Sequence, residues 1–239
     1  MKTLAVITAR GGSKRIPRKN IKPFLGKPIL LYSIQAALDS GVFDEVMVST
    51  EDEEIAELAG KAGAKVPFFR SSNTANDYAT TADVLLEVLE QYREMGMQFD
   101  YICCIYPTAP FVSAGRLREA MEKLTAQDAD ALLPVVKFSF PPQRSVVLGE
   151  DGFLRFKWQE YMLARSQDLE PFYHDAGQFY GLRVESFLEQ KKMVMEKTLP
   201  LVLPESEVQD IDTEEDWRIA EAKYRALHGE EKGYGTGED

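Results

Sequence analysis

Apolar and polar positions alternate along the chain with two different periods. Five short apolar runs predict buried strands, at residues 3–8, 44–50, 64–69, 101–106 and 129–136. Four intervening segments have the spacing of amphipathic helices, at residues 28–40, 51–62, 80–95 and 113–125. Strands that alternate with helices in this way predict an α/β fold, with a mostly parallel sheet and helices on both faces.

Local residues mark the ends of several predicted helices. Gly41 follows the end of the first helix, which is the favoured place of glycine. Thr80 and Asp83 have the spacing of a capping box at the start of the third helix, and so do Thr213 and Asp216 at the start of a last helix.

The regular pattern stops near residue 137. The segment that follows is rich in aromatic side chains and contains the pair Pro141-Pro142, so we expect an excursion from the sheet. Such a segment either packs against a second subunit or forms a local flap over the same core. Beyond it we predict strands at 177–183, 199–203 and 209–212, and a helix from 213. The predicted organisation is one domain from residues 1–136 and 174–228, an insertion at 137–173, and a flexible tail at 229–239.

A basic loop follows the first predicted strand. Residues 10–27 hold seven of the 28 Lys and Arg of the chain and none of its 39 Asp and Glu. Glycines allow backbone N–H groups to approach a phosphate closely, and the nearby cations can neutralise its oxygens. Neither the P-loop pattern nor the dinucleotide fingerprint occurs in the loop. The loop therefore predicts an anion site of another kind, with a solvated basic turn as the alternative.

The basic loop contrasts with the rest of the chain, whose formal net charge is −11. A negative field of this size argues against general binding to nucleic acid or to a membrane surface. No run approaches the ~20 apolar residues that a membrane-spanning helix needs, and no signal peptide is evident. The neighbours Cys103 and Cys104 would point to opposite faces of a strand. We expect reduced core thiols in a cytoplasmic protein.

A pair of carboxylates precedes the last predicted helix. Asp210 and Asp212 would point to one side of a strand while Ile211 faces the core. Two hard oxygen ligands on one side suit Mg²⁺, which proteins often hold with one or two carboxylates and substrate phosphates. The alternative is that Asp212 only helps to cap the helix. His174, taken alone, is more typical of a structural histidine than of a catalyst, and His228 is expected at the surface near the helix end.

Several segments in order along the chain carry a resemblance. ITARGGSKRIPRKNI, GKPIL, FDEVMVSTEDEEIAELA, GAKVPFFR, IYPTAP and QDIDTEEDW are similar to motifs of the CMP-sialic acid synthetase family of cytidylyltransferases. Within that family, ICCIYPTAPF and FYHDAGQFYG resemble the pseudaminic acid cytidylyltransferase branch. The resemblance implies a Rossmann-like, GT-A-like nucleotidyltransferase fold and a homodimer with a swapped dimerisation segment. The implied reaction converts CTP and an acidic nine-carbon sugar into the CMP-sugar and pyrophosphate, with Mg²⁺ as cofactor.

The resemblance also implies roles for individual residues. Those expected to bind the nucleotide are Ala9, Arg10, Gly11, Gly12, Ser13, Lys14, Lys19, Asn20, Arg70, Ala79 and Thr81. Those expected to bind the sugar are Tyr106, Arg165, His174 and Gln178. Asp210 and Asp212 match the metal-binding carboxylates of the family. The implied catalytic residues are Arg10 and Lys19, which balance charge on the leaving pyrophosphate, and Asp212.

Two departures from the sialic acid enzymes concern the sugar. Tyr106 stands where those enzymes usually carry Gln, and His174-Asp175-Ala176-Gly177 replaces their usual Arg-Pro-Asn-Gly. A changed sugar pocket is the simplest inference, while Gly181 departs from the aromatic residue expected in the branch. The alternatives are activation of sialic or legionaminic acid, a glycosyltransferase that consumes a nucleotide-sugar, and a non-catalytic nucleotide-binding module. The glycosyltransferase would need an Asp-x-Asp near residue 106, where the chain reads Tyr-Pro-Thr-Ala-Pro.

Overall fold

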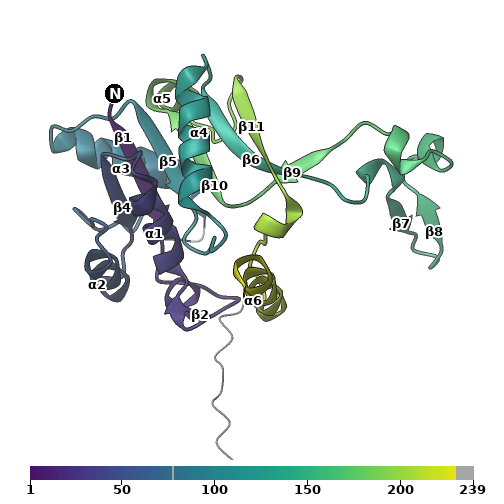
Figure 1. Cartoon of the computed structure of the whole chain (residues 1–239), viewed down its shortest axis with the longest axis horizontal. Helices are drawn as coiled ribbons and strands as arrows, with labels where there is room; N and C mark the ends of the chain where they lie inside the picture. Colours follow the sequence, from purple (N-terminus) through teal and green to yellow (C-terminus); the bar gives the residue numbers. More distant parts are fainter. Residues whose placement is uncertain (77, 230–239) are drawn as a thin grey trace, which may run out of the picture.

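The computed structural model describes residues 1–76 and 78–229. The strands of its central sheet are β1 (Thr3–Thr8), β4 (Glu45–Ser49), β5 (Tyr101–Ile105), β6 (Ala131–Lys137), β9 (Tyr173–Asp175), β10 (Phe179–Arg183) and β11 (Thr198–Leu203). Their order is β11-β6-β10-β5-β1-β4, and β9 pairs with the outer part of β6 (Figure 1). β9 and β10 run antiparallel to their neighbours, and the other strands run parallel to one another. The predicted α/β fold with a mostly parallel sheet is confirmed.

Helices cover both faces of the sheet. They are α1 (Leu30–Ser40), α2 (Glu53–Lys61), α3 (Thr81–Glu94), α4 (Ala114–Ala126) and α5 (Val184–Gln190). Side chains of a strand point alternately to the two faces. Ala5 and Ile7 of β1 accordingly pack in one core with α1, α2 and α4, whereas Leu4 and Val6 pack in a second core with α3 and α5.

The two cysteines follow the same alternation in β5. Cys103 lies in the core on the side of α1 and α4, and Cys104 lies in the core on the side of α3. Both are buried and free, as predicted. Burial raises the pKa of both thiols, that of Cys104 to about 12.

The predicted helix ends are confirmed. Thr80 caps α3 and Thr213 caps α6 (Glu214–His228), each within a complete capping box closed by Asp83 or Asp216. Gly41 ends α1 in the left-handed region at φ 66°. Each N-cap of this kind stabilises its helix by about 1 kcal/mol.

The strand predicted at residues 64–69 is wrong. Lys65 forms one isolated bridge to β4: its N–H donates to the carbonyl of Val46, and its carbonyl accepts from the N–H of Val48, both at 2.9 Å. Pro67 then interrupts the ladder, because proline has no N–H to donate. Phe68, after this proline, packs edge-on against Tyr92 of α3.

The strand predicted at residues 209–212 is also wrong. The N–H groups of Asp212 and Thr213 donate to the carboxylate of Asp216, at 3.1 and 2.8 Å, and not to a neighbouring strand. The predicted alternation of side chains is nevertheless present, because Ile211 is buried between two less buried aspartates. The strand predicted from residue 177 begins only at Phe179, after a turn.

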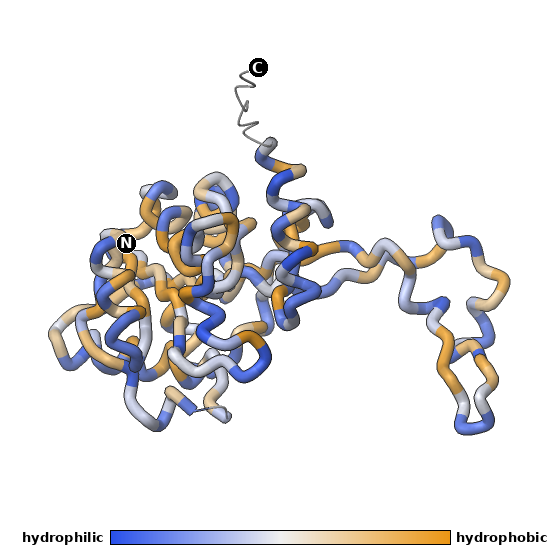
Figure 2. Tube along the Cα trace, turned by 90° about the horizontal axis from the view of Figure 1, so that it is seen from below, coloured by the Kyte–Doolittle hydropathy of each residue, from blue (hydrophilic) through white to orange (hydrophobic). Residues whose placement is uncertain are grey.

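Residues 138–172 form a segment, here called the arm, that extends away from the sheet (Figures 1 and 2). It contains the antiparallel pair β7 (Val146–Leu148) and β8 (Leu154–Phe156) and short 3₁₀ turns. Large apolar side chains on it are exposed, including Phe140 at 85% and Leu163 at 88%. Exposed apolar surface of this extent is typical of segments that contact another molecule.

The helix α6 ends at His228, whose exposed ring stacks on Tyr224 with 3.9 Å between ring centroids. Residues 230–239, most of the predicted tail, lie outside the described residues. In the part of the chain that is described, no helix combines the length and the apolar content needed to cross a bilayer.

Candidate active site

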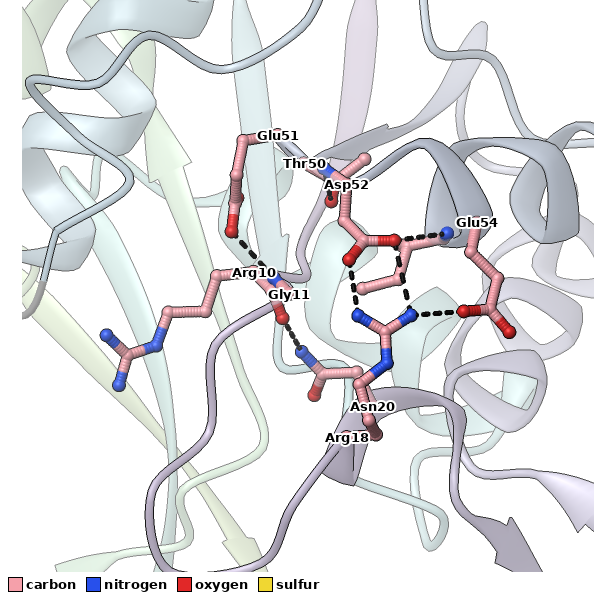
Figure 3. Close-up of polar contacts among 9 residues, drawn as sticks. Arg10, Gly11, Arg18, Asn20, Thr50, Glu51, Asp52 and Glu54 are labelled. Carbon is pink, nitrogen blue, oxygen red and sulfur yellow. Dashed lines mark hydrogen bonds and ion pairs between the residues drawn. The ribbon is translucent and has the colours of Figure 1, made fainter.

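The basic loop lies beyond the carboxyl end of β1 and is anchored to the turn between β4 and α2. The N–H of Gly11 donates to Oε1 of Glu51 at 2.7 Å, and Nδ2 of Asn20 donates to the carbonyl of Arg10 at 2.7 Å (Figure 3). Ala9 donates to the carbonyl of Ser49 at 3.0 Å and so continues the direction of the strand. These bonds give the loop a defined shape, which a solvated turn would not have.

An ion-pair cluster holds the far end of the loop. Arg18 adopts the left-handed conformation at φ 54°, and its guanidinium pairs with Asp52 and Glu54 at the start of α2 (Figure 3). Gly11 passes so close to this cluster that a Cβ added there would lie 2.5 Å from Oδ2 of Asp52. A side chain at position 11 would therefore displace the Asp52 carboxylate, which pairs with Arg18.

A first cavity, of about 360 Å³, opens over the basic loop. Its lining is mostly cationic and hydroxyl-bearing: Thr8, Arg10, Gly12, Ser13, Lys14, Arg15, Lys19, Asn20, Pro107 and Thr108. Six of the residues predicted to bind the nucleotide thus meet at one place. We call this space the phosphate cavity.

A second cavity, of about 200 Å³, adjoins the first and shares Thr8 and Arg10 with it. It is lined by Thr8, Arg10, Arg70, Thr74, Asn76, Ala79, Thr80, Thr81 and Val84. Arg70 is only 8% exposed and donates from its guanidinium to the side chain and the carbonyl of Ser49, at 3.1 and 2.7 Å. Burial lowers the pKa of this guanidinium. Three more residues predicted to bind the nucleotide, Arg70, Ala79 and Thr81, therefore lie together in this space, which we call the nucleoside cavity.

A third cavity, of about 500 Å³, lies between the sheet and the segment that leads to α6. Its lining is Tyr106, Val136, His174, Asp175, Ala176, Gly177, Tyr180, Glu205, Val208, Gln209, Asp210 and Lys223. Tyr106 and His174, two of the residues predicted to hold the sugar, are among them. We call this space the sugar cavity.

Two tyrosines, Tyr106 and Tyr180, line the sugar cavity side by side. The ring centroids of Tyr106 and Tyr180 are 5.4 Å apart. The Tyr180 hydroxyl donates to Oδ2 of Asp175 at 2.5 Å. Burial, and then the hydrogen bond to Asp175, raise the pKa of Tyr180. The hydrogen bond from Tyr180 thus holds the carboxylate of Asp175, which lines the sugar cavity.

The other residues predicted for the sugar have different environments. His174 is exposed, packs on Phe138 with 4.9 Å between ring centroids, and places Nδ1 2.8 Å from the carbonyl of Asp175. Gln178 is buried, and its amide donates to the carbonyl of Glu207 at 2.6 Å, outside the lining of the cavity. Arg165 lies on the arm and pairs with Asp168. A contact of Gln178 or Arg165 with the sugar stays a prediction.

The carboxylate pair is positioned by a small core of its own. Ile211 is buried with Ile16 of the basic loop, Phe24 and Trp217, and so brings the segment 210–212 against the loop. Phe24 belongs to β2 (Pro23–Phe24), which pairs with β3 (Lys27–Pro28) just after the loop. Asp210 thereby lies in the lining of the sugar cavity, and Asp212 lies beside Arg15 and Lys19, which line the phosphate cavity.

Two cations of the basic loop contact the segment that carries the carboxylate pair. Nζ of Lys19 donates to the carbonyl of Ile211 at 2.6 Å and lies 3.7 Å from Oδ1 of Asp212, while Arg15 pairs with Oδ2 of Asp212 at 2.7 Å. Burial lowers the pKa of Lys19. Burial, and then the charge of Asp212, raise the pKa of Asp210. Two carboxylates are thus held close together in a partly buried place, where a further cation relieves their repulsion.

The carboxylates of Asp210 and Asp212 fit a magnesium ion that is also bound by phosphate oxygens of a ligand. Among residues 1–76 and 78–229, no group of three or more His, Cys, Asp or Glu side chains is arranged to hold a metal by itself. Asp210 and Asp212 supply carboxylate oxygens, and the phosphate cavity beside them would supply phosphate oxygens. This combination is the usual one for Mg²⁺.

Sequence reasoning missed several lining residues. Arg15 was part of the basic loop but had no assigned role, and Thr8, Thr74 and Asn76 carried no motif of their own. Lys223 also lines the sugar cavity, although it lies about 50 residues after His174 in the sequence. The sequence pattern of its helix, α6, indicates only an amphipathic surface helix. Its position follows from the packing of α6 against the loop before it.

The fold and the three adjoining cavities define a nucleotidyltransferase-like site. Residues 4–198 match the Cytidylyltransferase family. The chain belongs to this family. It is 42% identical over 228 residues to a pseudaminic acid cytidylyltransferase of Campylobacter jejuni subsp. jejuni, covering 95% of this chain and 98% of that protein. It is 35% identical over 230 residues to a CMP-N,N'-diacetyllegionaminic acid synthase of Legionella pneumophila subsp. pneumophila, covering 92% and 95% of the two chains.

Solved structures show the same fold. CMP:2-keto-3-deoxy-manno-octonic acid synthetase in complex with CTP superimposes with a TM-score of 0.70 at 17% identity, covering 95% of this chain and 100% of that one. A 4-diphosphocytidyl-2C-methyl-D-erythritol synthase from Anaerococcus prevotii superimposes with a TM-score of 0.61 at 15% identity, covering 94% and 98%. The predicted resemblance to cytidylyltransferases is confirmed.

Proposed function

We propose that this chain is a Mg²⁺-dependent pseudaminic acid cytidylyltransferase, which converts CTP and pseudaminate into CMP-pseudaminate and pyrophosphate. The observation that carries the proposal is that Lys19, which lines the phosphate cavity, contacts the segment 210–212, whose Asp210 lines the sugar cavity. The choice of pseudaminate is supported by the relative from Campylobacter jejuni, which this chain matches over 95% of its length.

In the proposed reaction, the anomeric hydroxyl of the sugar gives its proton to a carboxylate of the pair Asp210 and Asp212, and its oxygen forms a bond to the α-phosphorus of CTP. The bond from that phosphorus to the bridging oxygen of pyrophosphate breaks. The nucleoside cavity orients the cytidine, and the N–H groups and cations of the basic loop hold the β- and γ-phosphates. Arg10 and Lys19 stabilise the negative charge that grows on the leaving pyrophosphate. Mg²⁺ on Asp210 and Asp212 would supply a Lewis acid for the phosphate and sugar oxygens.

We also propose a cytoplasmic homodimer formed through the arm. Its exposed apolar side chains need a partner surface, and Arg165, which does not line the sugar cavity of its own chain, would approach a sugar if the arm reached the cavity of another copy. The buried, free thiols are typical of a reducing compartment.

One assay tests the proposed function. Pyrophosphate release is measured from CTP and Mg²⁺ with pseudaminic, N,N'-diacetyllegionaminic and N-acetylneuraminic acid in turn, with Asp212→Asn as the inactive control. We expect release with pseudaminic acid. Preference for either of the other acids would contradict the proposed substrate, and CTP binding without release in any mixture would indicate a non-catalytic module.

A further inference from the structure

The sugar cavity has an unusual charge balance for a space that receives an acid. Three acidic residues line it, Asp175, Glu205 and Asp210. Of its lining residues, Lys223 is the one Lys or Arg. An anionic sugar that enters these surroundings needs a cation for its carboxylate, because an unpaired carboxylate beside others of the same sign is strongly disfavoured.

Lys223 is held in place by the loop that it faces. Its Nζ donates to the carbonyl of Val208 at 2.9 Å and to the carbonyl of Glu205 at 3.2 Å. An ammonium group has three N–H donors, so these two bonds leave one for a ligand. The helix that carries it is fixed by Trp217 and Ala220, which are buried in the small core with Ile211. The ammonium is therefore preorganised at the wall of the cavity.

The chemistry of the substrate requires the cation to lie near the reacting atoms. In a sugar acid of the 2-keto type, the carboxylate is bonded to the anomeric carbon, whose oxygen attacks CTP. The group that binds this carboxylate must therefore lie beside the carboxylate pair. Lys223 meets this condition, because it bonds to Val208, two residues before Asp210, and lines the same cavity as Asp210.

We propose that Lys223 binds the carboxylate of the sugar acid and orients the anomeric oxygen toward the α-phosphorus. The proposal rests on the proposed function. Arg165 does not fill this role within one chain, since it lies on the arm and pairs with Asp168. The opposite wall, with Asp175 held by Tyr180, is then left for the N–H and O–H groups of the rest of the sugar.

Lys223→Met tests the proposal, because it keeps the aliphatic stem and removes the charge. We expect the KM for the sugar acid to rise roughly ten- to a hundredfold, the range for loss of a hydrogen bond to a charged group. The KM for CTP should change less than threefold, and Lys223→Arg should stay within about fivefold of the wild type. Lys123→Met is the matched control, since Nζ of this helical lysine also donates to a backbone carbonyl, that of Pro200 at 2.6 Å, away from the cavities.

The methyl ester of the sugar acid separates binding from a merely structural role. Measured as a competitive inhibitor, the ester should bind the wild type and Lys223→Met with inhibition constants that agree within threefold. A KM for the acid unchanged in Lys223→Met, or equal losses for acid, ester and CTP, would overturn the role of Lys223 while leaving the proposed function intact. A wild-type enzyme inactive with every sugar acid would instead remove the proposed function, and the role of Lys223 with it.

Discussion

Replacement of Lys19 by alanine tests the junction between the phosphate cavity and the carboxylate pair. Nζ of Lys19 lies 2.6 Å from the carbonyl of Ile211 and 3.7 Å from Oδ1 of Asp212, and the side chain is 19% exposed. Its partners in the reaction are oxygens of the leaving pyrophosphate, whose charge grows in the transition state. Removal of one such donor costs about 2.7–4 kcal/mol of activation free energy, so we expect kcat to fall about 10²–10³-fold.

The same substitution should leave the fold intact. Asp212 is 37% exposed and keeps its pair with Arg15, so water screens the carboxylates that lose Lys19. We expect a loss of at most about 1 kcal/mol in the free energy of unfolding, as for other partly exposed ion pairs. Pyrophosphate release gives kcat, and thermal unfolding followed by circular dichroism gives the stability.

Lys22→Ala is the control in the same loop. Lys22 pairs with Glu214 at 2.6 Å and lies over the ring of Trp217 at 4.6 Å, but it does not line the phosphate cavity. Its loss should lower stability slightly and change kcat less than threefold. A kcat of Lys19→Ala within threefold of the wild type, at unchanged stability, would refute the role of Lys19 in charge stabilisation.

Three further predictions follow from other parts of the structure. Tyr180→Phe removes the hydroxyl that fixes a carboxylate of the sugar cavity, and should raise the KM for the sugar about tenfold while the KM for CTP stays unchanged in the same steady-state assay. Cys104, with a pKa of about 12, should not react with a thiol reagent at pH 8 in the native protein, because only about one thiol in ten thousand is ionised there; rapid labelling before unfolding would contradict its burial. Asp216→Ala removes the capping box of α6 and the acceptor for the N–H of Asp212, so it should lower the free energy of unfolding by about 1 kcal/mol and also lower kcat. The control Ser113→Ala, at the N-cap of α4, should lower the free energy of unfolding by a similar amount with no effect on kcat.

Much of the fold could be predicted from the sequence because local and tertiary preferences agree there. The apolar runs of β1 and β5 are buried on both faces, and the capping boxes at Thr80 and Thr213 depend only on residues three apart. The errors arose where a predicted strand lacked hydrogen-bond partners. Pro67 removed a donor after a single bridge, and Asp216 took the N–H groups that a strand at 209–212 would have needed.

The site could be predicted in part, and the limit is also physical. The charge and glycines of the basic loop indicated anion binding, and its lining residues do meet in one cavity. The pairing of Arg18 with Asp52 and the bond from Gly11 to Glu51 depend on two loops that only the sheet brings together. Lys223 depends likewise on how α6 packs, so spacing along the chain gave no sign of it.

The substrate is tested most directly by competition in one mixture. CTP and Mg²⁺ are incubated with the enzyme and equal concentrations of pseudaminic and N,N'-diacetyllegionaminic acid, and the two CMP-sugars are separated and quantified at early times. The ratio of initial rates equals the ratio of the kcat/KM values. We expect CMP-pseudaminate to form at least about tenfold faster. A contact that only pseudaminic acid makes, worth about 1.4 kcal/mol, would produce this ratio. Equal rates, or faster formation of the legionaminate product, would contradict the proposed function.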